Sequence, residues 1–243
     1  MNKISLFAAG SLRLACGPLL KVFEQETGQQ VEVTFGPAGL LRQRIELGER
    51  PQLFASANLD HPQRLVACGL AQQVQPFTRN KLCATVRNIP ALTEPDLLAL
   101  LCDPKWRVGT STPIADPSGD YALQLFERLE QLLPGQGRAL SARSLELVGG
   151  LDSVPIPAGR LAAHYLIEQQ QADIFLGYAS YACALAAYPQ IKVRMLPAVL
   201  DFNVTYGMCL LDEDCVAALS LAAFILSDRG QRILQRWGML PLH

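Results

Sequence analysis

Residues 3–12, KISLFAAGSL, hold the pattern that decides the fold. Lys3–Ala8 is predicted to be a buried strand, because its apolar side chains run nearly without interruption over a strand's length. The apolar residues that follow share one helix face, at Leu12, Ala15, Cys16, Leu19 and Phe23. Gly10 and Ser11 therefore form the turn that leads from a strand into the start of a helix.

The same strand, turn and helix order recurs along the chain, near Pro37, Pro117 and Pro157. The strand Val31–Phe35 leads into a helix expected at Ala38–Leu47, and Pro157 opens a helix expected at Ala158–Gln170. This alternation predicts an α/β protein. In an open parallel sheet such turns lie at the carboxyl ends of the strands, where ligands bind.

Length and composition exclude several classes of protein. The 243 residues correspond to about 1.6 domains, so one large domain or two lobes would fit. Half of the residues are hydrophobic, which argues against disorder. Lys and Arg total 21 against 22 Asp and Glu, so a nucleic-acid partner is not expected. No apolar run approaches the roughly 18 residues of a membrane span, so no membrane insertion is expected.

The cellular compartment stays open at this stage. Ile4–Ala8 is shorter than the hydrophobic core of a secretory signal, so no signal peptide is expected within this chain. The seven cysteines contain no CxxC pair, and most are expected to be small core residues. Seven thiols would be unusual in the periplasm, so the cytoplasm and the periplasm both remain possible.

The starts of these helices are candidate anion sites. Free backbone N–H groups and the helix dipole can hold an anion without net basic charge. At the first turn, Gly10 and the Ser11 hydroxyl could contact the anion, the alternative being that Ser11 is an ordinary N-cap. At the second turn, Ala38 and Gly39 could contribute only N–H groups, the alternative being a plain tight turn.

The segment ADPSGDY, residues 115–121, is the most distinctive turn. Ser118 and Gly119 could supply further N–H groups, and Ser118 a hydroxyl. Asp116 could bind a cation or a ligand hydroxyl, but a turn cap is favoured.

Two further side chains could reach an anion. Arg160, in the first turn of the expected helix, could pair with it, or it could be a solvated surface residue. Tyr178 follows Gly177 at a strand end and could donate its hydroxyl, or it could be an amphipathic rim residue.

No catalytic set, metal site or cofactor motif is expected. His61, His164 and His243 have no partner pattern. The sequence contains no GxSxG, P-loop or GxGxxG motif.

Taken in order, these segments resemble the substrate-binding proteins of molybdate and tungstate ABC transporters. The resemblance covers nearly the whole chain and rests on five stretches, which are LFAAGSL (6–12), FGPAGLLRQRIELGERPQLFASAN (35–58), ADPSGDYA (115–122), IEQQQADIFLGYAS (167–180) and AAFILSDRGQRILQRWGM (222–239).

The resemblance implies a type II periplasmic-binding-protein fold with two lobes. Each lobe would hold a mostly parallel sheet flanked by helices, and two crossover strands would join them near Lys81–Thr85 and Asp201–Thr205. Lobe 1 would comprise 1–82 and 202–243, and lobe 2 would comprise 83–201. A small oxyanion would be closed between them, and the protein would act as a monomer that serves an ABC permease from the periplasm.

Family contacts carry over residue by residue. Ser11 matches a ligand serine, Ser118 a small residue that offers its N–H, and Tyr178 a ligand tyrosine. Gly159–Arg160 stands at a helix-start contact, and Ala38–Gly39 stands where the family usually has serines.

The departures from the family pattern concern the identity of the ligand. The Ala38–Gly39 turn lacks a hydroxyl donor, and Arg160 adds a charge that could favour a larger organic anion. Asp116 matches one carboxylate of related archaeal tungstate binders, whereas Gly177 stands where they have another. The alternatives are a cytoplasmic enzyme on the same fold, acting on a small organic anion, and a sensor module.

Overall fold

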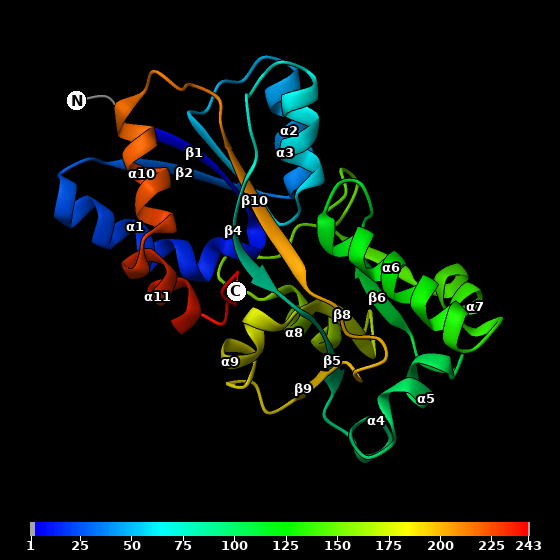
Figure 1. Cartoon of the computed structure of the whole chain (residues 1–243). Coiled ribbons are helices and arrows are strands. Elements are labelled where there is room, and N and C mark those ends of the chain that lie inside the picture. The colour runs from blue at the N-terminus through cyan, green and yellow to red at the C-terminus, as the bar shows by residue number, and fades with distance from the viewer. Residues whose placement is uncertain (1–2, 243) are drawn as a thin grey trace. The chain divides into compact units, whose positions relative to one another are not determined.

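The computed structural model describes residues 3–242, and its contacts divide the chain into two compact units (Figure 1). Unit 1 takes in Met1–Asn80 and Val204–His243, and unit 2 takes in Lys81–Asn203. The boundaries between the two units thus fall after residues 80 and 203. The lobe boundaries expected from the sequence, after 82 and 201, stay a prediction. His243 lies outside the described residues.

Unit 1 is built on a five-stranded sheet in the order β2-β1-β3-β10-β4. Its strands are β1 (Ile4–Ala9), β2 (Val31–Gly36), β3 (Leu53–Ser56), β4 (Gln75–Asn80) and β10 (Val204–Leu210). Its helices are η1 (Gly10–Leu12), α1 (Arg13–Thr27), α2 (Ala38–Glu46), α3 (Asp60–Ala67), α10 (Val216–Leu226) and α11 (Asp228–Arg236). Helices α1, α10 and α11 pack together as one group, and α2 and α3 form another (Figure 1).

Unit 2 has a second five-stranded sheet, in the order β7-β6-β8-β5-β9. Its strands are β5 (Leu82–Arg87), β6 (Val108–Ser111), β7 (Leu145–Val148), β8 (Ile174–Tyr178) and β9 (Ile191–Met195). Its helices are α4 (Pro90–Thr93), α5 (Leu97–Cys102), α6 (Pro117–Leu132), α7 (Gln136–Arg143), α8 (Ala162–Glu168), η2 (Ala179–Tyr181) and α9 (Ala182–Leu185).

The two sheets share one plan, in which a single strand runs against the others. In unit 1, β10 is antiparallel to both β3 and β4, while β1 is parallel to β2 and β3. In unit 2, β5 is antiparallel to β8 and β9. Each reversed strand is the first element after the chain enters that unit. The expectation of mostly parallel sheets flanked by helices is confirmed.

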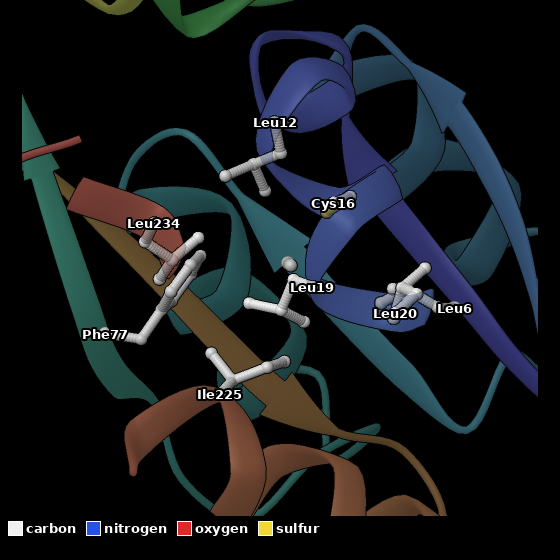
Figure 2. A pocket seen from close by; sticks show the side chains of 9 residues that line it. Leu6, Leu12, Cys16, Leu19, Leu20, Phe77, Ile225 and Leu234 are labelled. Carbon is white, nitrogen blue, oxygen red and sulfur yellow. The ribbon is translucent and has the colours of Figure 1, made fainter. Parts of the chain in front are cut away.

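The core of unit 1 lies between its sheet and the helix group α1, α10 and α11. Phe23 of α1 is fully buried there. Figure 2 shows that apolar side chains from η1, α1, β1, β4, α10 and α11 gather at one place. These side chains line a void of about 10 Å³. A water needs both that much room and polar partners, and the lining residues are Leu6, Leu12, Cys16, Leu19, Leu20, Ala55, Phe77, Ile225 and Leu234. The void is therefore a packing defect and not a ligand site.

Several expectations from the sequence are corrected. The helix expected at Ala158–Gln170 begins only at Ala162, because Gly159 has a positive φ of 78° and residues 157–160 form a turn. Strand β4 and helices α4 and α7 were not expected. Only three cysteines are buried (Cys16, Cys83 and Cys209), while Cys68 and Cys183 are exposed. Most cysteines are therefore not core residues.

Within residues 3–242, none of the helices is both long enough and apolar enough to cross a bilayer.

Candidate functional site

In each unit, the predicted contact residues follow the carboxyl ends of the parallel strands. In unit 1 this edge, called here the unit 1 half-site, comprises Gly10, Ser11, Ala38 and Gly39. The register aligns Ala9 of β1 with Gly36 of β2, which brings the two following turns side by side. The sheet therefore gathers two turns that are far apart in the sequence.

The first of these turns places Ser11 in the short helix η1, ahead of α1. No side chain caps η1 or α1, so Ser11 does not act as the N-cap that was one alternative. Its hydroxyl instead accepts a hydrogen bond from Tyr206 Oη at 2.9 Å. A serine hydroxyl has one proton to donate. Because Ser11 Oγ already accepts a hydrogen bond from within the unit, the Ser11 hydroxyl proton can be donated to a ligand.

Tyr206 was not among the expected site residues. It lies in β10, is fully buried, and also accepts a hydrogen bond from Asn80 Nδ2 at 3.2 Å. The sequence signal that could have indicated this role is a tyrosine within a short apolar strand, because a buried phenol usually has a hydrogen-bond partner. The partner itself could not be read from the sequence.

The second turn leads into α2. Pro37 at the N-cap has no side-chain hydrogen bond to the helix, and the first backbone bond of the helix runs from Leu41 N–H to Pro37 C=O. The N–H groups of Ala38, Gly39 and Leu40 thus precede the hydrogen-bonded part of the helix. This first turn provides partial positive charge at the unit 1 half-site.

Two neighbouring features were also missed by the sequence reasoning. Beyond β3, Asn58 Oδ1 accepts hydrogen bonds from the Ser56 hydroxyl at 2.8 Å and from His61 N–H at 3.2 Å. This arrangement tethers the start of α3. Beside Ser11, the Arg13 guanidinium lies 4.5 Å from the centre of the Phe35 ring, which fixes a cation near the turn.

In unit 2, the unit 2 half-site comprises Asp116, Ser118, Gly119 and Tyr178. Asp116 is the N-cap of α6: its Oδ1 accepts from Ser118 N–H at 3.1 Å and its C=O accepts from Gly119 N–H at 2.8 Å. The cap favoured for Asp116 is thus present. The two N–H groups expected to face a ligand already have protein acceptors, which leaves the Ser118 hydroxyl as the group to consider there.

The Asp116 carboxyl is closely surrounded. Gly149 follows β7 with a φ of 84°, and a Cβ at this position would stand 2.7 Å from Asp116 Cβ. Burial raises the pKa of Asp116 to about 6, and the Asp120 charge adds to the rise. Hydrogen bonds from Ser118 N–H and the Ser111 hydroxyl act in the opposite direction. The unit 2 half-site therefore holds a carboxyl that titrates close to neutral pH.

Arg160 lies outside any helix, just before α8. Its guanidinium forms an ion pair with Glu168 at the far end of α8 and lies 5.5 Å from the centre of the Tyr165 ring. Its Nη2 is 3.4 Å from His164 Nδ1. The charge of Arg160 is thus compensated within the protein, and its expected contact with an anion stays a prediction.

Tyr178 is the last residue of β8 and is 6% exposed. It pairs with Leu82 of β5, and the following residue donates its N–H to Lys81 C=O at 2.8 Å. Tyr178 therefore stands at the carboxyl edge of its sheet, close to the point where the chain enters unit 2. The expected Tyr178 contact with a ligand stays a prediction.

Across residues 3–242, no group of three or more His, Cys, Asp or Glu side chains is arranged to hold a metal ion.

Comparison with known proteins places the chain. Residues 4–240 match the family described as bacterial extracellular solute-binding protein. An uncharacterized protein of Pasteurella multocida (strain Pm70) is 39% identical over 237 residues, which cover 97% of this chain and 98% of that protein.

Two solved structures share the fold. The periplasmic molybdate-binding protein of Azotobacter vinelandii has a TM-score of 0.76 at 19% identity, covering 99% of this chain and 100% of that one. The sulfate-binding protein SubI of Mycobacterium tuberculosis H37Rv has a TM-score of 0.76 at 18% identity, covering 100% and 88%. The fold is the type II periplasmic-binding-protein fold. The chain belongs to the family of bacterial extracellular solute-binding proteins.

Proposed function

We propose that this protein binds a small tetrahedral oxyanion of the molybdate or tungstate type and delivers it to an ABC permease. The observation that carries the proposal is the unit 1 half-site, where the Ser11 hydroxyl and the open first turn of α2 lie at adjacent strand ends. Hydroxyl and amide donors suit an anion whose charge is spread over several oxygens. The solved relatives named above bind molybdate and sulfate, which supports the same ligand class.

The formal charge is consistent with this proposal. With a net charge of −1, recognition has to come from local dipoles and not from a basic surface. Arg13 contributes a nearby cation to the unit 1 half-site. Within unit 2, the Ser118 and Tyr178 hydroxyls are the proposed ligand contacts.

The test is calorimetric titration of the desalted protein with molybdate, tungstate, sulfate and phosphate. Ser11→Ala and Tyr178→Phe should each weaken binding by about 1–3 kcal/mol, the range for a hydrogen bond to a charged partner. Ser144→Ala is the matched control, because its hydroxyl is bonded to Ser141 C=O away from both half-sites. If none of the four anions binds, the oxyanion proposal is wrong. If binding occurs but neither variant changes it, the residues are wrongly assigned.

A second candidate ligand follows from Asp116. A carboxylate beside a bound oxyanion repels it, whereas the same carboxylate can accept a hydrogen bond from a ligand hydroxyl. This favours an organic anion that carries hydroxyl groups, for which glycerol phosphate is a suitable probe. Tighter binding of glycerol phosphate than of any inorganic anion would select this candidate.

The proposed compartment is the periplasm, as expected for a partner of an ABC permease. Cell fractionation of the full-length gene product would test it. Recovery in the cytoplasm would favour the alternative of an enzyme or a sensor on the same fold. Turnover of a small organic anion would then identify the protein as an enzyme.

A further inference from the structure

We propose that Tyr206 and Asn80 are positioning residues, which hold the Ser11 hydroxyl as a hydrogen-bond donor toward a bound oxyanion. The inference rests on the proposed function and explains why the Ser11 hydroxyl donates its proton toward the ligand. The three side chains belong to unit 1 and come from β10, β4 and η1.

The chemistry of the groups sets the direction of these hydrogen bonds. The Asn80 amide nitrogen can only donate, so Tyr206 Oη is the acceptor at 3.2 Å. The single phenol proton then points to Ser11 Oγ at 2.9 Å. Ser11 Oγ is the acceptor in that bond, and its own proton is left for a third group. A serine without this arrangement could turn its proton toward the protein instead.

The surroundings keep the phenol in place. Tyr206 and Asn80 are both fully buried, and the Tyr206 ring meets the Phe77 ring edge to face at 6.2 Å. The register between β10 and β4 shifts between Tyr206 and Gly207, and such a bulge redirects a side chain. A Cβ on Gly207 would stand 2.8 Å from Leu59 Cδ2, so this strand is held closely against its neighbours. A donor fixed before binding loses less entropy when the anion arrives.

The competing explanation is that these bonds only satisfy a buried phenol and so contribute to stability alone. Thr78 provides a matched control for this case. It is also buried, lies opposite Tyr206 in the register, and donates its hydroxyl to Leu240 C=O at 2.9 Å without contacting Ser11. Loss of the Thr78 hydroxyl removes its hydrogen bond to Leu240 C=O, and loss of the Tyr206 hydroxyl removes those to Asn80 and Ser11. Only Tyr206→Phe removes the contact with Ser11.

The experiment titrates four variants and the unmodified protein with molybdate and, separately, with sulfate. The variants are Tyr206→Phe, Ser11→Ala, the double variant and Thr78→Val. Tyr206→Phe should raise the Kd about three- to ten-fold, Ser11→Ala about ten-fold or more, and the double variant no further than Ser11→Ala within about two-fold. Thr78→Val should lower the melting temperature and leave the Kd unchanged.

Three results would overturn the inference. They are an unchanged Kd for Tyr206→Phe, an equal loss of affinity in Thr78→Val, and independent effects of Tyr206→Phe and Ser11→Ala that multiply in the double variant.

A second readout separates this inference from the proposed function. In protein labelled with carbon-13 at the tyrosine ring Cζ, Ser11→Ala should shift the Tyr206 signal without any ligand, and Ser144→Ala should not. If the unmodified protein binds none of molybdate, tungstate, sulfate and phosphate, the proposed function fails and the positioning role fails with it. If binding is normal but Ser11→Ala leaves the chemical shift of the Tyr206 signal unchanged, only the positioning role is wrong.

Discussion

Replacing Asp116 with Asn should stabilise the protein near neutral pH. The exchange removes a charge and keeps an oxygen at the position that accepts from Ser118 N–H. In the natural protein, burial raises the pKa of Asp116 from 3.8 to about 6. The folded state therefore binds the proton more tightly than the unfolded state. The contribution of Asp116 to the stability of the natural protein must therefore fall as pH rises between these two values.

The size of the effect follows from the same two values. At about 1.4 kcal/mol for each pKa unit, the rise from 3.8 to about 6 corresponds to a limit of about 3 kcal/mol. Asp116 keeps part of its surface exposed, which reduces the penalty. The free energy of unfolding of Asp116→Asn should therefore exceed that of the natural protein by a margin that grows with pH. We expect this margin to be about 1–3 kcal/mol larger at about pH 7.5 than at about pH 4.

Urea unfolding of both proteins across this pH range is the assay. Asp152→Asn removes an exposed carboxyl in the same unit and serves as the control, with no comparable gain expected. A difference between Asp116→Asn and the natural protein that stays constant with pH would refute the reasoning. A variant that is less stable than the natural protein only at the higher pH would also refute it.

Three further predictions concern unfolding free energies measured in urea. Gly119→Ala should cost about 1–3 kcal/mol or more, because the new Cβ would stand 2.5 Å from Pro113 N, in a backbone that cannot move aside easily; a neutral result would mean that the turn is looser than described. Asp173→Ala should cost about 3–5 kcal/mol, since this buried carboxylate pairs with Arg87 and with Arg107, whose Nε lies 3.0 Å away; a loss below about 1 kcal/mol would show the pairs to be dispensable. Phe54→Ala should cost about 3–5 kcal/mol for a fully buried ring, and a much smaller loss would mean that the core collapses around it.

The local order of elements was predictable because it depends on neighbouring residues. Val31–Phe35 was expected as a strand and lacks only the last residue of β2, and Lys3–Ala8 differs from β1 by one residue at each end. Strand β4 was missed because QPFTRN is polar and contains Pro76, both unfavourable in a strand by sequence alone. It exists because β10 and the Arg79–Leu240 bridge pair with it.

Helix α7 was missed for a similar reason. Gln136–Arg143 is polar with little one-sided hydrophobicity. It is held by a close approach to α6, where a Cβ on Gly137 would stand 2.1 Å from Phe126 C=O. Contacts of this kind join segments that are separate in the sequence, so local patterns do not reveal them.

In the candidate site, too, local features were predictable from the sequence and long-range contacts were not. The turns at Ser11 and Ala38 were predictable from the strand and helix patterns around them. The partner of Ser11 lies 195 residues away, and no local pattern indicates a contact of that range. The Arg160 ion pair with Glu168 was obscured because the sequence placed both residues in one continuous helix.

The cysteine distribution provides a tool for watching this protein at work. Cys68 in unit 1 and Cys183 in unit 2 are exposed, whereas burial raises the pKa of the Cys16, Cys83 and Cys209 thiols to about 12 and keeps them from reacting. After the half-buried Cys102 and Cys215 are changed to serine, each unit would carry one thiol that accepts a fluorescent dye. Energy transfer between the two dyes would then report, molecule by molecule, any rearrangement that an added anion induces.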